Sequence, residues 1–422
     1  MQPVDKPPLL FYAQALFYPL LGPVEWAARM PNFIASLLLA PLVGVWAWRL
    51  FRDEKTAVLA ALLVALFPLS IQFSATAFTD PLLTTLLVAS LATINRRQIT
   101  ANYQPPATSR YSALFFGLAV MTKHQAWLFL PLLVGLGWLN GWRWVKWRRW
   151  LAWFLPFVGA LLAWEWARTG TLQLWSAQAA NFGGVRLIWS WELWPRLQAW
   201  ATMWGQAAGS IWLAGLFLAI AVWAGIGVWH GRSHQTPTIA LLILFAAGYF
   251  LLHWLLAIPI WDRYLLPLLP ILTLVIARQL AFITPHSVFL IFLLLPGAWL
   301  ARDGRFPIGG QPHADQGAAI VVQALDDAPY GAVLYDHWDS WQWRYHLFDK
   351  RVYASWFPSL DALAEELAVF GGDGNPHYLT LPDTAVAQPV KRVVAQAGFR
   401  LQFVPLSAPS QIQLYEIIAT GD

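Results

Sequence analysis

The chain has 422 residues, of which 58% are hydrophobic and only 12% are charged, with a mean hydropathy of +0.50. A soluble domain carries about 25% charged residues, so this composition excludes a wholly soluble protein, and the lack of cysteine excludes disulfides and thiolate metal sites. The net charge of +5 does not indicate nucleic-acid binding, because the basic residues lie in short segments beside apolar runs, which is typical of membrane orientation.

Apolar stretches of membrane-spanning length recur over the first three-quarters of the chain. A short one at 8–21 predicts a juxtamembrane or re-entrant helix. About ten spanning helices are then predicted, at 28–49, 56–78, 80–95, 109–122, 125–141, 150–168, 207–229, 236–258, 263–280 and 284–301. The polar and aromatic segment 169–206 is predicted to be a loop.

The composition changes near residue 302 to that of a soluble domain, which predicts a membrane domain at 1–301 and a second domain at 302–422. In the second domain, helical patterns alternate with strand-like runs, so a small α/β fold is expected. The predicted helices are 316–326, 358–369 and 384–396, and the predicted strands are 331–335, 376–380, 399–405 and 411–418. The fold class is therefore an α-helical polytopic membrane protein with a small C-terminal α/β domain.

Lysine and arginine at the span ends indicate the orientation, because they are enriched in cytoplasmic loops. Most of them fall on one side, including the aromatic and basic run 142–149, which is interpreted as an interfacial anchor. That side is assigned to the cytoplasm, and the C-terminal domain is then extracytoplasmic in a multi-pass plasma-membrane protein. The orientation depends on two short helices that meet near Lys123. A single helix over 109–141 would be about 50 Å long, against a hydrocarbon core of about 30 Å.

With this orientation, ionisable residues from separate stretches come to the outer face. A charge near hydrocarbon is costly, so partners or a function must offset the cost. The candidates are Asp5, Lys6, Asp80, Lys123, His124, Glu165, Asp262, Arg263 and Tyr264. Two carboxylates beside several cations suit an anionic head group and acid–base chemistry.

Each candidate also has a purely structural interpretation. Asp80 before Pro81 can simply begin a helix, where a carboxylate complements the helix dipole. Lys123 and Arg263 can extend to lipid head groups, and His124 can be a packed histidine. Only the set as a whole favours a functional site.

Several of these residues occur in motifs that resemble the GT-C glycosyltransferases of the protein O-mannosyltransferase and aminoarabinose-transferase superfamily. The resemblance covers roughly residues 3–300, and the acidic-Lys-Pro-Pro element at its start is the most specific part. The matching motifs, in order, are Asp5-Lys6-Pro7-Pro8-Leu9, Ala28-Arg29-Met30-Pro31, Phe67-Pro68, Thr79-Asp80-Pro81-Leu82, Thr122-Lys123 and Arg263-Tyr264-Leu265-Leu266-Pro267.

The resemblance implies transfer of a sugar from a polyprenyl-phosphate carrier to a protein, lipid or glycan acceptor on the extracytoplasmic face. It implies that Asp80 is the catalytic residue that supports the chemistry and that Lys6, Arg263 and Tyr264 lie near the donor phosphate, with Lys123 as a further phosphate ligand. Asp5 matches an acidic residue that contributes to a metal site, so a divalent metal is a candidate cofactor.

Two alternatives stay open. A transporter or lipid flippase would have inverted repeats and polar groups near the bilayer midplane, and the sequence has no such repeat. The family also has a spanning helix and a loop acidic residue, usually taken as the catalytic base, before the position of Asp5. The sequence therefore also allows an inactive truncated homologue, or a start at an internal methionine of a longer frame.

Overall fold

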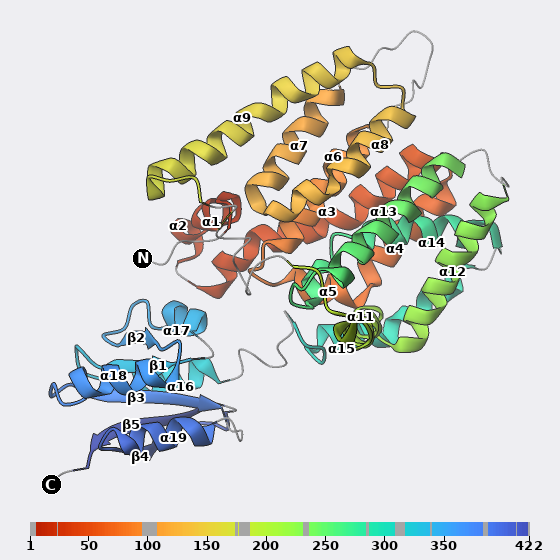
Figure 1. Cartoon of the computed structure of the whole chain (residues 1–422). Coiled ribbons are helices and arrows are strands. Elements are labelled where there is room, and N and C mark those ends of the chain that lie inside the picture. Colours follow the sequence, from red (N-terminus) through yellow and green to blue (C-terminus); the bar gives the residue numbers. More distant parts are fainter. Residues whose placement is uncertain are drawn as a thin grey trace. The chain divides into compact units, whose positions relative to one another are not determined.

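The chain forms two compact units, Met1–Gly310 and Gln311–Asp422. Figure 1 gives the order of their helices and strands in a computed structural model of the chain. The residues that the structure describes are 6–22, 24–94, 108–173, 176, 186–230, 236–283, 287–308, 317–337, 340–382, 387–410 and 412–420.

The described part of the first unit is helical. Its helices are α1 (Leu9–Ala15), α2 (Tyr18–Leu21), α3 (Glu25–Phe51), α4 (Glu54–Leu66), α5 (Pro68–Ser74), α6 (Asp80–Ile94), α7 (Thr108–Thr122), η1 (His124–Phe129), α8 (Leu130–Leu139), α9 (Trp144–Thr169), η3 (Ser190–Glu192), α11 (Leu193–Ala208), α12 (Ile211–Trp229), α13 (Thr236–Leu255), η4 (Asp262–Tyr264), α14 (Leu269–Ile283), η5 (Ser287–Leu294) and α15 (Leu295–Arg302). In Figure 1, α3, α6, α7 and α9 run alongside one another, and successive pairs of them are in contact.

Among the described residues, four helices are long and apolar enough to cross a membrane, namely α3, α9, α12 and α13. A fifth span is obtained if α4 and α5 are counted together, although they are bent by 58°. The segment predicted to span at 56–78 is therefore a bent pair of helices, and its crossing of the membrane stays a prediction. The bend falls at Phe67-Pro68, because proline lacks the amide hydrogen that the preceding helix would need.

The predicted break at Lys123 is confirmed. This residue has an extended backbone (φ −160°, ψ 139°) between α7 and η1, so 109–141 is not one helix. An aromatic cluster fixes the break, because Trp127 of η1 packs edge-on against Phe116 of α7 and Phe154 of α9, with ring centroids 6.4 and 5.5 Å apart. Two further aromatic contacts join Phe116 and Phe154 to Trp150.

The segments around α9 are more helical than the sequence predicts. Helix α9 begins at Trp144 and includes most of the run 142–149, whose role as an interfacial anchor stays a prediction. Residues 169–206 are not wholly a loop, since α11 occupies Leu193–Ala208. Apolar residues at helical spacing, such as Leu193, Leu197 and Trp200, form one face of α11, although no run of spanning length is present.

Helix α6 connects two polar regions of the first unit. Asp80 is its first residue, and near its other end the carbonyl of Ala92 accepts a hydrogen bond from Arg49 at 2.9 Å. Those two positions lie about 18 Å apart at 1.5 Å per residue. The charges grouped around Asp80 are thus separated along the bundle from the contacts of Arg49.

The second unit contains a five-stranded sheet in the order β2-β1-β3-β5-β4. Its elements are α16 (Ala318–Ala324), β1 (Val333–Asp336), α17 (Ser340–His346), β2 (Tyr353–Trp356), α18 (Leu360–Phe370), β3 (His377–Pro382), α19 (Ala387–Gln396), β4 (Phe399–Val404) and β5 (Ile412–Ala419). Strands β1, β2 and β3 are parallel, with Val333 opposite Tyr353 and His377, and β5 is antiparallel to β3 and β4. The predicted α/β character is confirmed, but the sequence reading missed β2 and α17.

Both faces of this sheet are covered. Leu334 packs with Val321 of α16 and Trp343 of α17, whereas the next residue, Tyr335, packs with residues of α18 and α19. This alternation is what a strand buried on both faces requires.

Candidate active site

The centre of the candidate site is a buried ion pair. Nζ of Lys123 lies 2.5 Å from Oδ1 of Asp80, and the two side chains are 13% and 1% exposed. Asp80 begins α6, and Lys123 occupies the break after α7, so the start of one helix and the end of another supply the pair. The carboxylate Oδ2 of Asp80 is buried and has no hydrogen-bond partner within the described part of the chain.

Two more cations act on this pair. The positive charges of Arg263 and Lys6 both interact electrostatically with Lys123, and the negative charge of Asp80 opposes them. The group of Lys6, Lys123, Arg263 and Asp80, called the cation cluster below, therefore carries three positive charges and one negative charge. The positive charges repel one another, so binding of an anion stabilises the cation cluster.

Aromatic rings surround the two innermost cations. Lys123 lies over the ring of Tyr264 at 5.2 Å, and the guanidinium of Arg263 lies 3.7 Å from the ring centroid of Trp261. Arg263 also faces Phe78 at 5.4 Å, in the segment before α6. These ring faces hold the cations without neutralising them.

The segment that leads into Asp80 is held by Asn32 of α3. The side-chain amide of Asn32, which is fully buried, donates to the carbonyls of Thr76 at 2.7 Å and Phe78 at 2.6 Å. An asparagine inside an apolar span is costly unless its amide is hydrogen-bonded. The position of Asn32 in an apolar stretch could therefore have indicated a functional or structural role, which the sequence analysis missed.

A second support joins the break at Lys123 to the turn that carries Arg263. The phenol of Tyr249 in α13 accepts a hydrogen bond from the side chain of Gln125 and donates to the carbonyl of Tyr264 at 2.8 Å. His253 stacks on the ring of Tyr249 with centroids 4.2 Å apart. Because these residues are far apart in the sequence, pattern reading could not identify the network.

The structure thus brings together Lys6, Asp80, Lys123, Arg263 and Tyr264 among the predicted residues. Asp262 is buried beside them, and its carboxylate accepts a hydrogen bond from the backbone of Arg263 at 2.7 Å. His124 is buried directly after Lys123, and Glu165 is buried in α9, and their roles stay predictions. Asp5 lies outside the described residues.

The residues that the structure describes contain no group of three or more His, Asp or Glu side chains suited to a metal ion. Asp80, the buried carboxylate of the cluster, is engaged by Lys123 instead. These residues alone do not fit a divalent metal.

Comparison with known proteins places this geometry in context. A profile of the dolichyl-phosphate-mannose-protein mannosyltransferase family matches residues 5–165, a segment that includes Lys6, Asp80 and Lys123. No curated protein matches the chain by sequence.

Solved structures share the fold. ArnT from Cupriavidus metallidurans bound to undecaprenyl phosphate aligns with a TM-score of 0.63 at 14% identity, over 98% of this chain and 88% of that one. The apo state of the same protein aligns with a TM-score of 0.61 at 16% identity, over 98% and 87% of the two chains. The Archaeoglobus fulgidus oligosaccharyltransferase aligns with a TM-score of 0.55 at 12% identity, over 90% of this chain and 59% of that one.

The fold is that of a membrane protein, with apolar helices long enough to cross a bilayer and a small C-terminal α/β unit. Residues 5–165 match the mannosyltransferase family, and the whole chain shares its fold with ArnT and the oligosaccharyltransferase.

Proposed function

We propose that the chain transfers a sugar from a polyprenyl-phosphate donor to an acceptor on the extracytoplasmic face of the plasma membrane. The observation that carries this proposal is the cation cluster, in which three cations and one carboxylate meet at the ends of helices. The undecaprenyl phosphate bound to the ArnT neighbour supports a donor of this class.

Lys123, Arg263 and Lys6 bind the phosphate that links the sugar to the lipid. As the bond between the sugar and the phosphate breaks, negative charge grows on the leaving phosphate, and fixed cations stabilise that charge. The rings of Tyr264 and Trp261 limit access of water to the two inner cations, which strengthens their attraction for the phosphate.

Asp80 supports the chemistry mainly as a positioning residue. Its Oδ1 fixes the ammonium of Lys123, and its side chain is too enclosed to receive a proton directly from a bulky acceptor. Its Oδ2, which is buried beside the ion pair, adds to the field that orients Lys123. The direct catalytic role expected from the sequence is therefore replaced in this proposal by an indirect one.

For the membrane arrangement, we propose that shorter helices such as α6, α7, α8 and α14 complete about ten crossings with the longer spans. The cation cluster then lies at the outer ends of α6, α7 and α14, and residues 302–422 form an extracytoplasmic domain. This arrangement follows the excess of basic residues at the opposite span ends.

The test uses the full chain in proteoliposomes with a panel of monosaccharides linked to undecaprenyl phosphate, together with a mixture of lipid, glycan and peptide acceptors that receives the sugar. The expected result is release of undecaprenyl phosphate from at least one donor, and strong loss of release in Lys123→Met. The matched control is Lys146→Met, which removes the same charge from an exposed position in the first turn of α9. Equal turnover in the two variants would exclude the proposed site, and movement of intact donor across the bilayer without release would indicate a flippase.

A further inference from the structure

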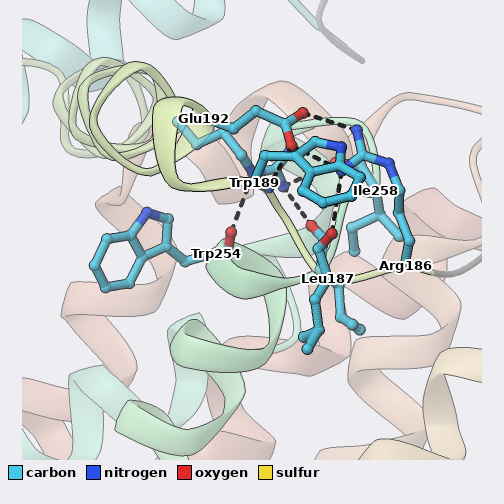
Figure 2. Close-up of polar contacts among 8 residues, drawn as sticks. Arg186, Leu187, Trp189, Glu192, Trp254 and Ile258 are labelled. Atoms are coloured by element: carbon cyan, nitrogen blue, oxygen red, sulfur yellow. Dashed lines mark hydrogen bonds and ion pairs between the residues drawn. The ribbon is translucent and has the colours of Figure 1, made fainter.

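A tryptophan-rich turn at residues 186–192, called the Trp turn below, precedes α11. Figure 2 shows that its polar groups bond to one another. The guanidinium of Arg186 binds both carboxylate oxygens of Glu192, at 2.7 and 2.9 Å, and Glu192 also accepts from the backbone of Trp189 at 2.7 Å. The Arg186 pairing and the Trp189 backbone bond lower the pKa of Glu192 to about 2, so the turn keeps its ion pair at neutral pH.

The Trp turn is attached to the end of a membrane span. The amide of Ile188 donates to the carbonyl of Leu255, the last residue of α13, at 3.0 Å, and the amide of Ala257 donates to the carbonyl of Arg186 at 2.9 Å. Helix α13 has 20 residues and is therefore about 30 Å long, which is the thickness of the hydrocarbon core. Leu255 thus lies where the span leaves the hydrocarbon, and the Trp turn lies at the same depth.

Arg196 reinforces this attachment. Its guanidinium donates to the carbonyls of residues 253, 254, 256 and 258 at 2.7–3.0 Å. The indole of Trp254 in turn donates to the carbonyl of Leu193 at 3.0 Å. The last carbonyls of a helix have no hydrogen-bond partner within the helix, and these bonds supply one. Backbone groups near a bilayer must be paired in this way because hydrocarbon offers no hydrogen bonds.

The outward surface of the Trp turn is apolar. Leu187 and Trp191 are each 70% exposed and Trp189 is 54% exposed, and Trp194 in the first turn of α11 is 63% exposed. The indoles of Trp189 and Trp191 stack with their planes 10° apart and centroids 5.4 Å apart. Rigid, exposed indoles beside internally satisfied charges suit the head-group region, where one part of the ring is apolar and another is wet.

We propose that the Trp turn inserts into the head-group region of the bilayer and so sets the depth of the cation cluster. The connection is short, because Arg196 holds residues 253–258 and Arg263 follows five residues later. The second half of this inference rests on the proposed function, since depth matters only if the cluster binds the phosphate of a membrane lipid.

The absence of cysteine in the chain allows a direct test of depth. A nitroxide is attached to Trp191→Cys in the full chain, in vesicles of phosphatidylethanolamine and phosphatidylglycerol. Its relaxation by oxygen, which concentrates in lipid, is compared with its relaxation by an aqueous nickel complex. The references are Trp223→Cys, an exposed residue of span α12, and Val369→Cys, an exposed residue of α18 in the second unit.

We expect oxygen to relax the nitroxide at residue 191 more strongly, and nickel to relax it less strongly, than the nitroxide at residue 369. We also expect the nitroxide at 191 to lie at a shallower depth than the one at 223. Adding Arg186→Ala should shift it toward the aqueous reference, because the turn loses its ion pair. If Trp191→Cys does not fold, Leu187→Cys reports on the same surface. A label that matches the reference at 369 overturns the anchor. Since depth is measured without turnover, this failure is separate from any failure of the glycosyltransferase proposal.

Discussion

The Asp80–Lys123 ion pair makes a specific prediction about stability. Removing one partner of a buried pair leaves an uncompensated charge and costs about 3–5 kcal/mol, whereas replacing both partners is often nearly neutral. Asp80→Asn and Lys123→Met should therefore each destabilise the protein, and the double variant should be more stable than either single variant.

The two single variants should also differ from each other. Asp80→Asn leaves Lys123 beside Arg263 and Lys6 with no counter-charge among the four residues, whereas Lys123→Met leaves two cations and one carboxylate in the cluster. Asp80→Asn should thus cost more. Unfolding free energies are measured by titration with SDS in mixed micelles, and costs that simply add in the double variant would show that the pair is not coupled.

Binding separates this structural effect from the proposed function. A hydrogen bond to a charged group contributes about 1.5–3 kcal/mol, so loss of Lys123 should weaken binding of undecaprenyl phosphate roughly 10- to 150-fold. The double variant should regain stability without regaining this affinity. Affinity equal to that of the Lys146→Met control would refute the assignment of Lys123 to the phosphate.

Three further predictions follow from other contacts. Asn32→Ala removes two buried hydrogen bonds that hold the segment before Asp80, so it should cost about 1–3 kcal/mol of unfolding free energy. It should also lower donor release more than Asn140→Ala, which removes a bond to the carbonyl of Leu136 in α8, remote from the cation cluster. Equal effects on donor release would contradict this role for Asn32. Gly297→Ala should destabilise by about 1–3 kcal/mol, because its Cβ would lie 2.9 Å from Cα of Gly209. Gly225→Ala, with open space around the new Cβ, should be neutral or slightly stabilising. Denaturation of both variants checks this, and equal stability would speak against the close approach of Gly209 to Gly297. The pKa of Glu192 in the folded protein is about 2, against an ordinary value of 4.5. The Trp turn should therefore be fully stable above about pH 4.5 and should loosen as the pH falls toward 2. The mobility of a spin label at residue 191 reports this loosening, and loosening that begins near neutral pH would contradict the ion pair.

Much of the membrane unit followed from the sequence because long apolar runs have few alternative structures. The break at Lys123 was predictable from length alone, since one helix over 109–141 exceeds the bilayer. The proximity of Asp80, Lys123 and Arg263 was predictable because successive spans cross the membrane in alternate directions. This places charges from distant segments on one face.

Features that depend on contacts between distant residues were not predictable. The phenol of Tyr249 bridges Gln125 and Tyr264 only after α13 packs beside η1 and η4. Helix α11 has an amphipathic pattern without spanning length, so it resembled a loop rich in tryptophan. Strand β2 has four residues, and only its pairing with β1 identifies it as a strand.

The measurement that bears most directly on the central claim is a structure of the full chain in a nanodisc with undecaprenyl phosphate. We expect the phosphate to lie within hydrogen-bond distance of Lys123 and Arg263, with the Asp80–Lys123 ion pair intact. A phosphate bound elsewhere, at a helix end remote from Asp80, would contradict the account.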